Sequence, residues 1–194
     1  LKIAEMVQPC VLWIDEIEKG LSGASRGNDS GVSSRIFGTL LTWMQDKKAQ
    51  VFVMATANDI TTLPPELLRK GRFDEIFFLD LPLASTRKRI FEDKIRKTGR
   101  SPEEFDLDAM VDCSAEFSGA EITTAVEEGL LKAFLAKETF GTDHVIRELR
   151  ATKPLSVTSK DRIEEIRRWG AASARPAEVE VETASSSRNT RFGL

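Results

Sequence analysis

The amino-acid sequence predicts an α/β fold in which part of a parallel sheet is followed by a smaller, purely helical subdomain. Three short apolar runs, at residues 11–14, 51–57 and 76–79, alternate with segments of helical periodicity, a pattern typical of parallel sheets with crossover helices. After Pro82 only helical patterns follow. Polar residues stand at the end of each run, and open α/β sheets bind their ligands at the carboxyl ends of their strands.

The first apolar run lies between a short helix and a polar loop. Residues 2–7 carry apolar side chains on one helical face, and we interpret them as the last turns of a helix that starts in a longer protein. The run at 11–14 leads directly into Asp15 and Glu16, and its unbroken apolar character predicts a strand buried on both faces. Residues 20–34 are rich in Gly, Ser, Asn and Asp and predict a mobile loop. Because no Gly-Lys-Ser/Thr ends this loop, it is a poor candidate for a phosphate cradle.

The second and third runs are each preceded by a helical pattern. Before the second run, apolar side chains recur at helical spacing: Ile36, Phe37, Leu40, Leu41 and Met44. The run at 51–57 then ends at Asn58 and Asp59. Residues 62–71 predict a short helix, with proline near its start and Gly71 just past its end, as helix termini prefer.

The remaining chain predicts four helices, at residues 84–97, 106–113, 119–138 and 159–169. Ser118 and Glu121 fit a capping box at the start of the third of these helices. The apolar stripe of that helix contains small residues suited to close packing: Ile122, Ala125, Val126, Gly129 and Ala133. We therefore expect an α/β part at 1–82, a helical subdomain at 83–150, a helical extension at 151–170 and a disordered tail at 171–194.

The composition argues against several classes of function. The chain of 194 residues carries 28 Lys and Arg against 31 Asp and Glu, a net charge of −3, so no overall basic character indicates nucleic-acid binding. Cys10 and Cys113 form no disulfide or zinc pattern, which fits a reducing compartment. The single histidine, His144, has no partners at metal-ligand spacing. No apolar stretch approaches the roughly 18 residues expected of a membrane span.

The acidic pair Asp15 and Glu16 is the strongest indication of chemistry in the residues themselves. At the end of a buried strand, one carboxylate can hold Mg²⁺ through water and the next can polarise a water that attacks a phosphate. A capped strand-to-helix turn without any catalytic role explains the pair equally well at this point.

Four segments, in order and at plausible separations, resemble the motifs of the AAA+ ATPases. Residues 11–16 resemble the Walker B strand of the P-loop NTPase sheet, and residues 55–58 resemble the sensor-1 strand. Residues 67–74 resemble the arginine-finger segment, and residues 117–122 resemble the start of the lid helix that closes over the nucleotide base. The first and third segments are most similar to a little-characterised group, the cyanobacterial and chloroplast-encoded AAA proteins known only as a hypothetical reading frame, which has wider bacterial relatives.

The resemblance implies a role for each candidate residue. Asp15 would hold the water shell of Mg²⁺, Glu16 would polarise the attacking water, and Asn58 would bond that water or the γ-phosphate of ATP. Arg69 and Arg72 would act in trans on the nucleotide of a neighbouring subunit, because a guanidinium stays charged and matches phosphate oxygens. In the lid, the backbone of two small residues would approach the adenine and ribose: Gly119 and Ala120.

Purely structural roles compete with these assignments. Asn58 is also a common turn residue, and Gly119 is also suited to close packing. Arg69 could act only on a helix dipole, and Arg72 could form a salt bridge to Asp74. The 20–34 loop resembles the family's second pore loop by position, but a plain flexible connection fits equally well.

The sequence departs from the family pattern in both subdomains. No Gly-x-x-x-x-Gly-Lys-Ser/Thr occurs in it, so the phosphate loop, if there is one, would precede Leu1. A sheet without the strand that feeds this loop exposes apolar side chains, and we predict that this chain alone neither binds ATP tightly nor hydrolyses it. In the lid, Lys94 stands where many relatives have a histidine near the base, and no sensor-2 arginine precedes Ala120.

Three functions remain open on the sequence. The leading hypothesis is the C-terminal part of an ATP- and Mg²⁺-dependent ring motor, a hexamer in the intact protein, that remodels an unknown protein partner. The second is a nucleotide-gated scaffold without catalysis, or a degenerate remnant of an ATPase. The third, a DNA-linked AAA+ machine, is opposed by the acidic balance. The family resemblance and the lack of a targeting segment predict a location in the cytoplasm or the plastid stroma.

Overall fold

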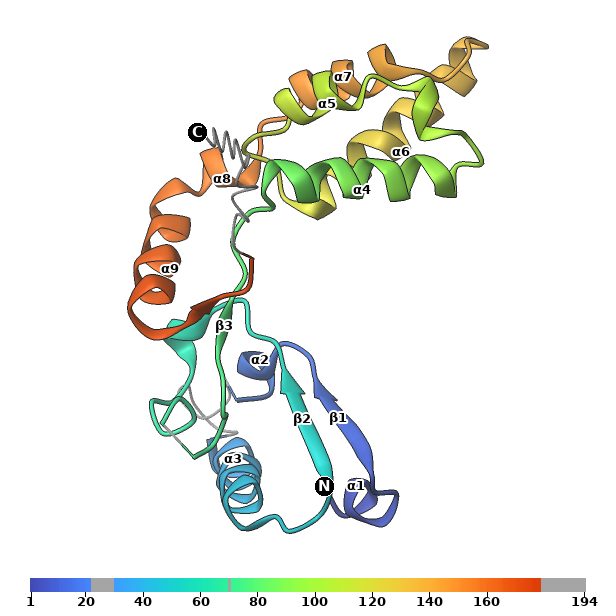
Figure 1. Ribbon diagram of the computed structural model, residues 1–194. Helices are drawn as coiled ribbons and strands as arrows, with labels where there is room; N and C mark the ends of the chain where they lie inside the picture. The colour runs from blue at the N-terminus through green and yellow to red at the C-terminus, as the bar shows by residue number, and fades with distance from the viewer. Residues whose placement is uncertain (22–29, 70, 179–194) are drawn as a thin grey trace, which may run out of the picture. The chain divides into compact units, whose positions relative to one another are not determined.

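The structure is a computed structural model, and it describes residues 1–21, 30–69 and 71–178. The chain divides into two compact units, Leu1–Ile76 and a second unit that begins at Phe77, and each is described by itself (Figure 1). Within the described ranges, no helix combines the length and the apolar character needed to cross a membrane.

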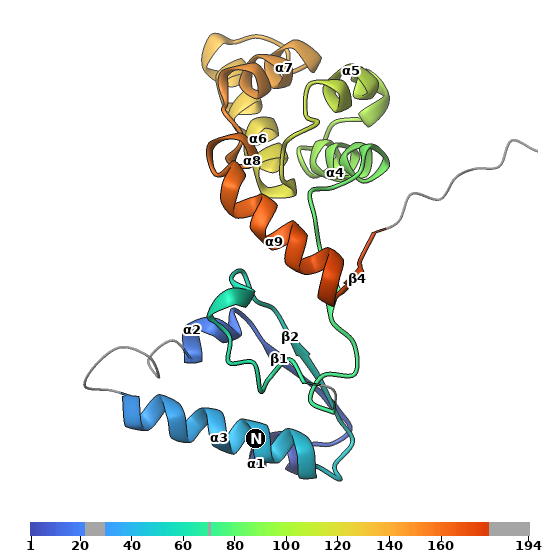
Figure 2. The ribbon, with the colours of Figure 1, turned by 90° about the vertical axis from the view of Figure 1, so that its left-hand side faces the viewer.

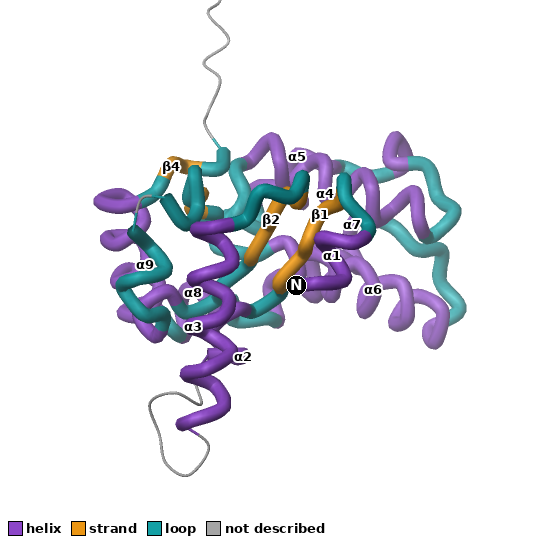
Figure 3. The backbone as a smooth tube through the Cα atoms, turned by 90° about the horizontal axis from the view of Figure 1, so that it is seen from below, coloured by secondary structure: helices purple, strands orange, loops and turns teal. Residues whose placement is uncertain are grey.

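The first unit is built on a parallel pair of strands, β1 (Cys10–Ile14) and β2 (Val51–Ala55), which lie side by side in Figure 3. Both strands and their parallel pairing were predicted from the apolar runs, and the prediction is confirmed. The helices of this unit are α1 (Lys2–Met6), α2 (Ile17–Leu21), α3 (Ser30–Asp46) and the 3₁₀ turn η2 (Ile60–Thr62).

One face of the β1–β2 sheet packs on α3 and forms the core of this unit. Leu40 and Met44 of α3 are buried against the first residue of α2, Ile17. Leu63 and Leu67, from the segment after η2, complete the cluster. Leu40 and Met44 confirm part of the apolar face that the helical spacing predicted, whereas Ile36 of the same predicted face is 57% exposed.

The other face of the same sheet is bare among the described residues. The register places Val11 beside Phe52 and Trp13 beside Met54, so all four side chains share one face. Their exposed fractions are 63%, 68%, 57% and 45%. The prediction that the first strand is buried on both faces is therefore wrong for this chain, because α3 covers only the opposite face.

Two connections of the first unit differ from the sequence prediction. Residues 30–34, predicted as loop, belong to α3, while residues 22–29 of that loop lie outside the described part. Of the predicted helix at 62–71, Thr62 ends η2 and residues 63–69 and 71 form turns, in which the Leu67 amide donates to the Pro64 carbonyl at 3.0 Å. The Leu68 amide likewise donates to the Pro65 carbonyl, three residues back, at 3.2 Å, so the chain closes single turns here and not an α-helical ladder. Gly71 has a φ of 91°, a conformation that favours glycine.

The second unit contains the helices α4 (Ala84–Lys97), α5 (Leu107–Asp112), α6 (Gly119–Ala136) and α7 (Thr142–Ala151), with a 3₁₀ turn, η3 (Pro102–Glu104), after α4. The predicted helices at 84–97, 106–113 and 119–138 are confirmed to within two residues, whereas α7 was not predicted. A single core joins these helices, with fully buried side chains from each: Phe91, Ile95, Met110, Ile122, Val126 and Val145.

The predicted stripe of small residues on α6 packs closely on α7. A Cβ added at Gly129 would lie 3.2 Å from the backbone carbonyl carbon of His144, a contact so tight that the α7 backbone would have to shift to accept it. The capping box at the start of α6 is also confirmed, with Ser118 and Glu121 bonded reciprocally through side chains and backbone. Both features were predicted from local sequence alone.

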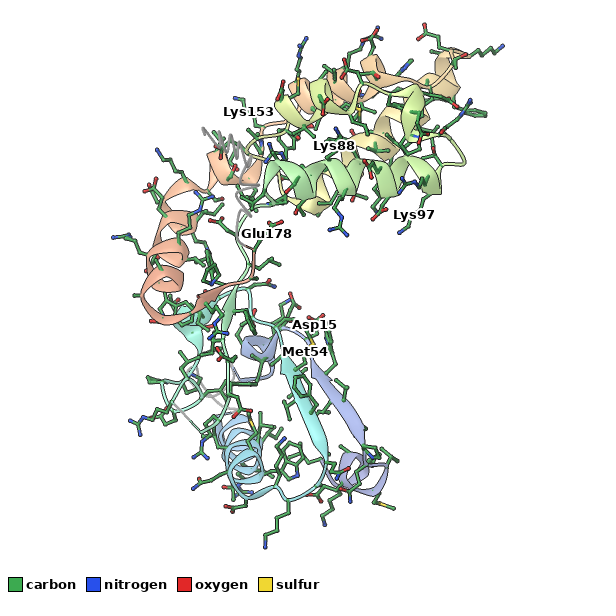
Figure 4. The ribbon with its side chains drawn as sticks, viewed as in Figure 1. Asp15, Met54, Lys88, Lys97, Lys153 and Glu178 are labelled. Atoms are coloured by element: carbon green, nitrogen blue, oxygen red, sulfur yellow. The ribbon has the colours of Figure 1, made fainter. Side chains whose placement is uncertain are left out.

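The C-terminal segment of the described chain folds back onto the first residues of the second unit (Figures 2 and 4). It comprises α8 (Leu155–Thr158), α9 (Lys160–Ser173) and β4 (Arg175–Pro176), and β4 pairs in parallel with β3 (Phe77–Phe78). The third apolar run therefore forms a strand in a separate two-stranded sheet.

Side chains reinforce this return of the chain. Arg167 bonds both carboxylate oxygens of Asp80 at 2.9 Å, and Glu178 accepts hydrogen bonds from the Leu83 amide at 3.2 Å and from the Thr86 hydroxyl. Residues 171–178 were predicted to be disordered but are part of α9, β4 and these contacts. The rest of the predicted tail, 179–194, lies outside the described residues.

Candidate functional site

The carboxyl ends of β1 and β2 lie together, and each leads into a polar segment. The ladder between the strands continues past their ends, because the Thr56 amide donates to the Ile14 carbonyl at 3.0 Å and the Ile17 amide donates to the Thr56 carbonyl at 2.9 Å. Asp15 lies just beyond the tip of β1, close to Met54 near the end of β2 (Figure 4). The two predicted acidic residues are thus held against the end of the neighbouring strand.

The two carboxylate residues share one hydrogen-bonding partner, the hydroxyl of Thr56. This hydroxyl donates to Asp15 Oδ1 and accepts from the Glu16 amide at 3.0 Å. Glu16 has a φ of 47°, in the left-handed region that residues other than glycine rarely adopt. Such a backbone conformation persists only where the surroundings hold it.

The Glu16 side chain bridges an amide and an ammonium group. Its Oε1 accepts from the Asn58 side-chain amide at 2.7 Å, and its Oε2 lies 2.5 Å from Lys19 Nζ. The hydrogen bond from Lys19 to Glu16 and the charge of Glu16 raise the pKa of Lys19 above its ordinary value, so Lys19 stays charged at neutral pH. The structure therefore brings together three of the predicted site residues: Asp15, Glu16 and Asn58.

The backbone of Asn58 is fixed by a second carboxylate. Glu18 is buried, and its Oε1 accepts from the Asn58 amide at 3.0 Å. The side-chain amide of Asn58 is consequently presented to Glu16 from an anchored backbone.

The donor set at the strand ends fits Mg²⁺ bound through water. Mg²⁺ usually takes one or two carboxylates and completes its shell with water and substrate phosphates, and Asp15 offers an exposed carboxylate here. In the described part of the chain, no group of three or more His, Cys, Asp or Glu could hold a metal by itself. His144 instead lies 3.0 Å from the carboxylate of Glu138.

The two predicted arginines are not drawn into this cluster. Arg72 donates from Nη1 to Gln45 Oε1 of α3 at 2.7 Å, which is a different contact from the Asp74 salt bridge considered above. Arg69 is exposed, and no helix ends at it, since its segment consists of turns. Its carbonyl accepts from the Arg72 amide at 3.3 Å, so the two arginines share one turn.

The predicted base-contacting residues belong to the second unit. Gly119 is the first residue of α6, and a Cβ added to it would lie 3.3 Å from the Ile90 side chain of α4. Gly119 therefore packs close to α4, as its alternative structural role predicts. Ala120 is exposed, and Lys94 is half-buried on α4.

Three residues that organise the strand ends were not singled out by the sequence: Thr56, Glu18 and Lys19. The pairing of Ile14 with Ala55 puts Asp15 level with Thr56, so a signal existed once the register was known. Glu18 and Lys19 follow the acidic pair in a short helix, where charged residues ordinarily face solvent.

The amino-acid sequence is similar to that of known AAA proteins. A model of the ATPase family associated with various cellular activities (AAA) matches residues 1–81. The uncharacterised AAA domain-containing protein ycf46 of Guillardia theta is 44% identical over 173 residues, which cover 89% of this chain and 34% of that protein. The ycf46 protein of Pyropia yezoensis is 45% identical over 170 residues, 87% of this chain and 35% of that protein. The chain thus spans about a third of the length of these relatives.

Solved structures show the same fold. The crystal structure of the FIGL-1 AAA domain in complex with ADP matches with a TM-score of 0.69 at 16% identity, covering 89% of this chain and 61% of that one. A second crystal structure of the FIGL-1 AAA domain matches with the same TM-score at 16% identity, covering 89% of this chain and 60% of that one. Residues 1–81 therefore match the AAA family of ATPases, and the chain has the α/β fold of an AAA domain and is related to the ycf46 proteins.

Proposed function

We propose that this chain is part of an ATP-hydrolysing AAA protein in which Asp15, Glu16 and Asn58 act on the terminal phosphate of ATP. The observation that carries the proposal is the 2.7 Å hydrogen bond between Asn58 and Glu16 at the carboxyl edge of the sheet. An acid and an amide that meet at this edge can bind and polarise one water molecule, which is what phosphoryl transfer to water requires.

Each residue has a distinct part in the proposed chemistry. Asp15 would hold Mg²⁺ through water, and the bound ion would neutralise charge on the phosphates. Glu16 would orient the attacking water, and Asn58 would hold either that water or a phosphate oxygen. Each oxygen of Glu16 already accepts one bond, so a water would use a remaining lone pair or displace the Lys19 ammonium.

Arg69 and Arg72 are proposed to act in trans, in a hexameric ring that remodels a protein partner. The exposure of Arg69 supports this, as does the half-buried position of Arg72, whose guanidinium donates to the neutral amide of Gln45, because a guanidinium that must reach a neighbour cannot be fully buried in its own unit. An arginine of this kind is worth about 10³–10⁵ in rate in related systems. Gly119 and Ala120 are proposed to lie against the base and ribose, on the family resemblance alone.

Several parts of the proposal concern the longer protein. The 194-residue chain carries no Gly-x-x-x-x-Gly-Lys-Ser/Thr, so we propose that it neither binds ATP tightly nor hydrolyses it when isolated. The competing proposal is a scaffold without catalysis. We propose a location in the cytoplasm or plastid stroma, in keeping with the relationship to the ycf46 proteins.

Two experiments test the proposal. The coding sequence upstream of Leu1 should contain a strand followed by Gly-x-x-x-x-Gly-Lys-Ser/Thr, whereas a true start near Leu1 would favour the scaffold. In the full-length gene product, Arg72→Ala should abolish ATP hydrolysis and leave nucleotide binding largely intact. Gln45→Ala is the matched control, since it removes the partner of Arg72 but keeps the guanidinium, and it should remain active.

The trans arrangement has its own test. Arg72→Ala subunits keep their acid but lack the guanidinium, and Glu16→Gln subunits have the opposite defect. Mixing the two inactive variants should restore hydrolysis if the arginine serves a neighbouring subunit. No recovery in mixed rings of confirmed composition would contradict the trans role.

A further inference from the structure

Four hydrogen bonds converge on Thr56, the first residue after β2. Its amide and carbonyl continue the strand ladder to Ile14 and Ile17, at 3.0 and 2.9 Å. Its hydroxyl accepts from the Glu16 amide at 3.0 Å and donates to Asp15 Oδ1. One side chain therefore contacts both members of the acidic pair, although 40 residues separate it from Glu16.

Asp15 and Glu16 depend on the side-chain hydroxyl of Thr56 for two of their hydrogen bonds. Glu16 sits at a φ of 47°, so its amide points away from the regular ladder and needs an acceptor of its own. A hydroxyl can accept from that amide and donate to a carboxylate at the same time, whereas valine has the same shape but can do neither. The backbone bonds to Ile14 and Ile17 do not depend on the side chain.

We propose that Thr56 is a positioning residue, whose hydroxyl holds Asp15 and the left-handed Glu16 in the orientation that hydrolysis needs. The inference rests on the proposed function, because it concerns the same two carboxylates. Beyond the proposed function, it states that the Thr56 side chain, just after the neighbouring strand, sets the orientation of Asp15 and Glu16. Without that hydroxyl, Glu16 would lose the bond that keeps its backbone in the left-handed region, and its carboxylate would leave Asn58.

The hydrogen-bonding part of the proposal is tested in the 194-residue chain by amide hydrogen exchange. In Thr56→Val, the Glu16 amide loses its acceptor and should exchange about tenfold faster or more. The Ile17 amide keeps its acceptor, the Thr56 carbonyl, so its exchange rate should change little. A protected Ile17 amide also shows that the variant is folded. Thr56→Ser should retain the protection of Glu16. Thr39→Val, which removes an exposed hydroxyl bonded within α3, is the matched control.

An equal increase at Glu16 and Ile17 would mean that the valine loosens the whole strand end, and would overturn the proposal. Unchanged protection of Glu16 in Thr56→Val would overturn it as well. Neither readout requires ATP hydrolysis, so this arm decides the role of Thr56 even if the proposed function fails.

The catalytic part is tested in the full-length gene product. Thr56→Val should lower kcat for ATP hydrolysis by about tenfold to a hundredfold and leave KM for ATP within about threefold, because it misplaces the acid and spares the nucleotide contacts. Thr56→Ser should recover most of the activity. If Glu16→Gln is inactive but Thr56→Val keeps wild-type kcat, positioning by Thr56 is refuted and the proposed function stands. If wild type and Glu16→Gln are both inactive despite a phosphate loop, the proposed function itself fails.

Discussion

Asn58 donates a hydrogen bond from its side-chain amide to the carboxylate of Glu16 at 2.7 Å, although the two residues are 42 positions apart in the chain. They meet because β1 and β2 are parallel neighbours whose carboxyl ends coincide. The Asn58 backbone is in turn held by the buried Glu18. Residues that follow both strands therefore fix this contact: Glu16 accepts from the side chain of Asn58, and Glu18 accepts from its backbone.

Asn58→Ala should weaken hydrolysis without abolishing nucleotide binding. Removal of the amide leaves the Glu16 carboxylate with Lys19 as its remaining side-chain partner and withdraws one donor from the proposed water site. In the full-length gene product we expect kcat for ATP to fall by about tenfold to a hundredfold. Thr62→Val, which removes an exposed hydroxyl that donates to the Asp59 carbonyl, is the control and should retain activity. Equal losses in both variants would point to a general disturbance of this segment.

The bare face of the β1–β2 sheet predicts self-association of the 194-residue chain. Phe52 is 68% exposed beside Val11, and a contiguous apolar face of this kind favours association. Phe52→Thr should weaken self-association about tenfold, since burying one such ring is worth about 1.5–3 kcal/mol. Light scattering over a concentration series measures the effect. Phe134→Ser, which removes an exposed ring on α6, should have little effect, and an equal effect would locate the association elsewhere.

Ser118→Ala should destabilise the helical unit. Ser118 caps α6 by accepting from the Glu121 amide, and loss of such a cap costs about 1 kcal/mol. Thermal or urea unfolding followed by circular dichroism measures the change. Thr124→Ala, at an exposed position on the same helix, should stay within about 0.5 kcal/mol of wild type. Equal free energies of unfolding for Ser118→Ala and Thr124→Ala would contradict a stabilising role of the cap.

Glu121 should make the helical unit sensitive to acid. Burial alone would raise the pKa of its carboxyl, but hydrogen bonds from the Ser118 amide, the Leu155 amide and the Ser118 hydroxyl outweigh burial, and the pKa lies below its ordinary value. A lowered pKa means that the stabilisation is complete above about pH 4.3 and is lost as the pH falls through the folded-state pKa.

Glu121→Gln should therefore be less stable at neutral pH and should show a shallower loss of stability below about pH 4. Urea unfolding at several pH values measures both effects. Glu128→Gln, at an exposed position of α6, is the control and should keep the wild-type profile. An acid profile of Glu121→Gln that matches wild type would contradict the assignment.

The parts of the fold that the sequence predicted are those with local signals. The apolar runs predicted β1 and β2, and the capping pair Ser118 and Glu121 predicted where α6 begins. The pairing of Phe77 with Arg175 was out of reach, because a two-residue strand has no periodicity and its partner lies 98 positions away. The exposure of Trp13 was missed for a related reason, since an apolar run does not reveal which of its faces is covered.

The candidate site divides in the same way. Asp15, Glu16 and Asn58 could be proposed because polar side chains follow buried strands, and the structure brings them together. Thr56 could not be recognised, because its importance comes from the register between two strands and from the unusual backbone of Glu16. Arg72 and its contact with Gln45 depend on packing between α3 and a turn, which local sequence does not encode.

The most direct test of the account is ATP hydrolysis by the full-length gene product and its Glu16→Gln variant, measured in a single turnover together with ATP binding. Glutamine keeps the shape of Glu16 and an oxygen acceptor for Asn58, but it removes the charge that polarises water. We predict that Glu16→Gln binds ATP as tightly as wild type and hydrolyses it at least about a hundredfold more slowly. Hydrolysis at the wild-type rate would contradict the central role of the acidic pair at the end of β1.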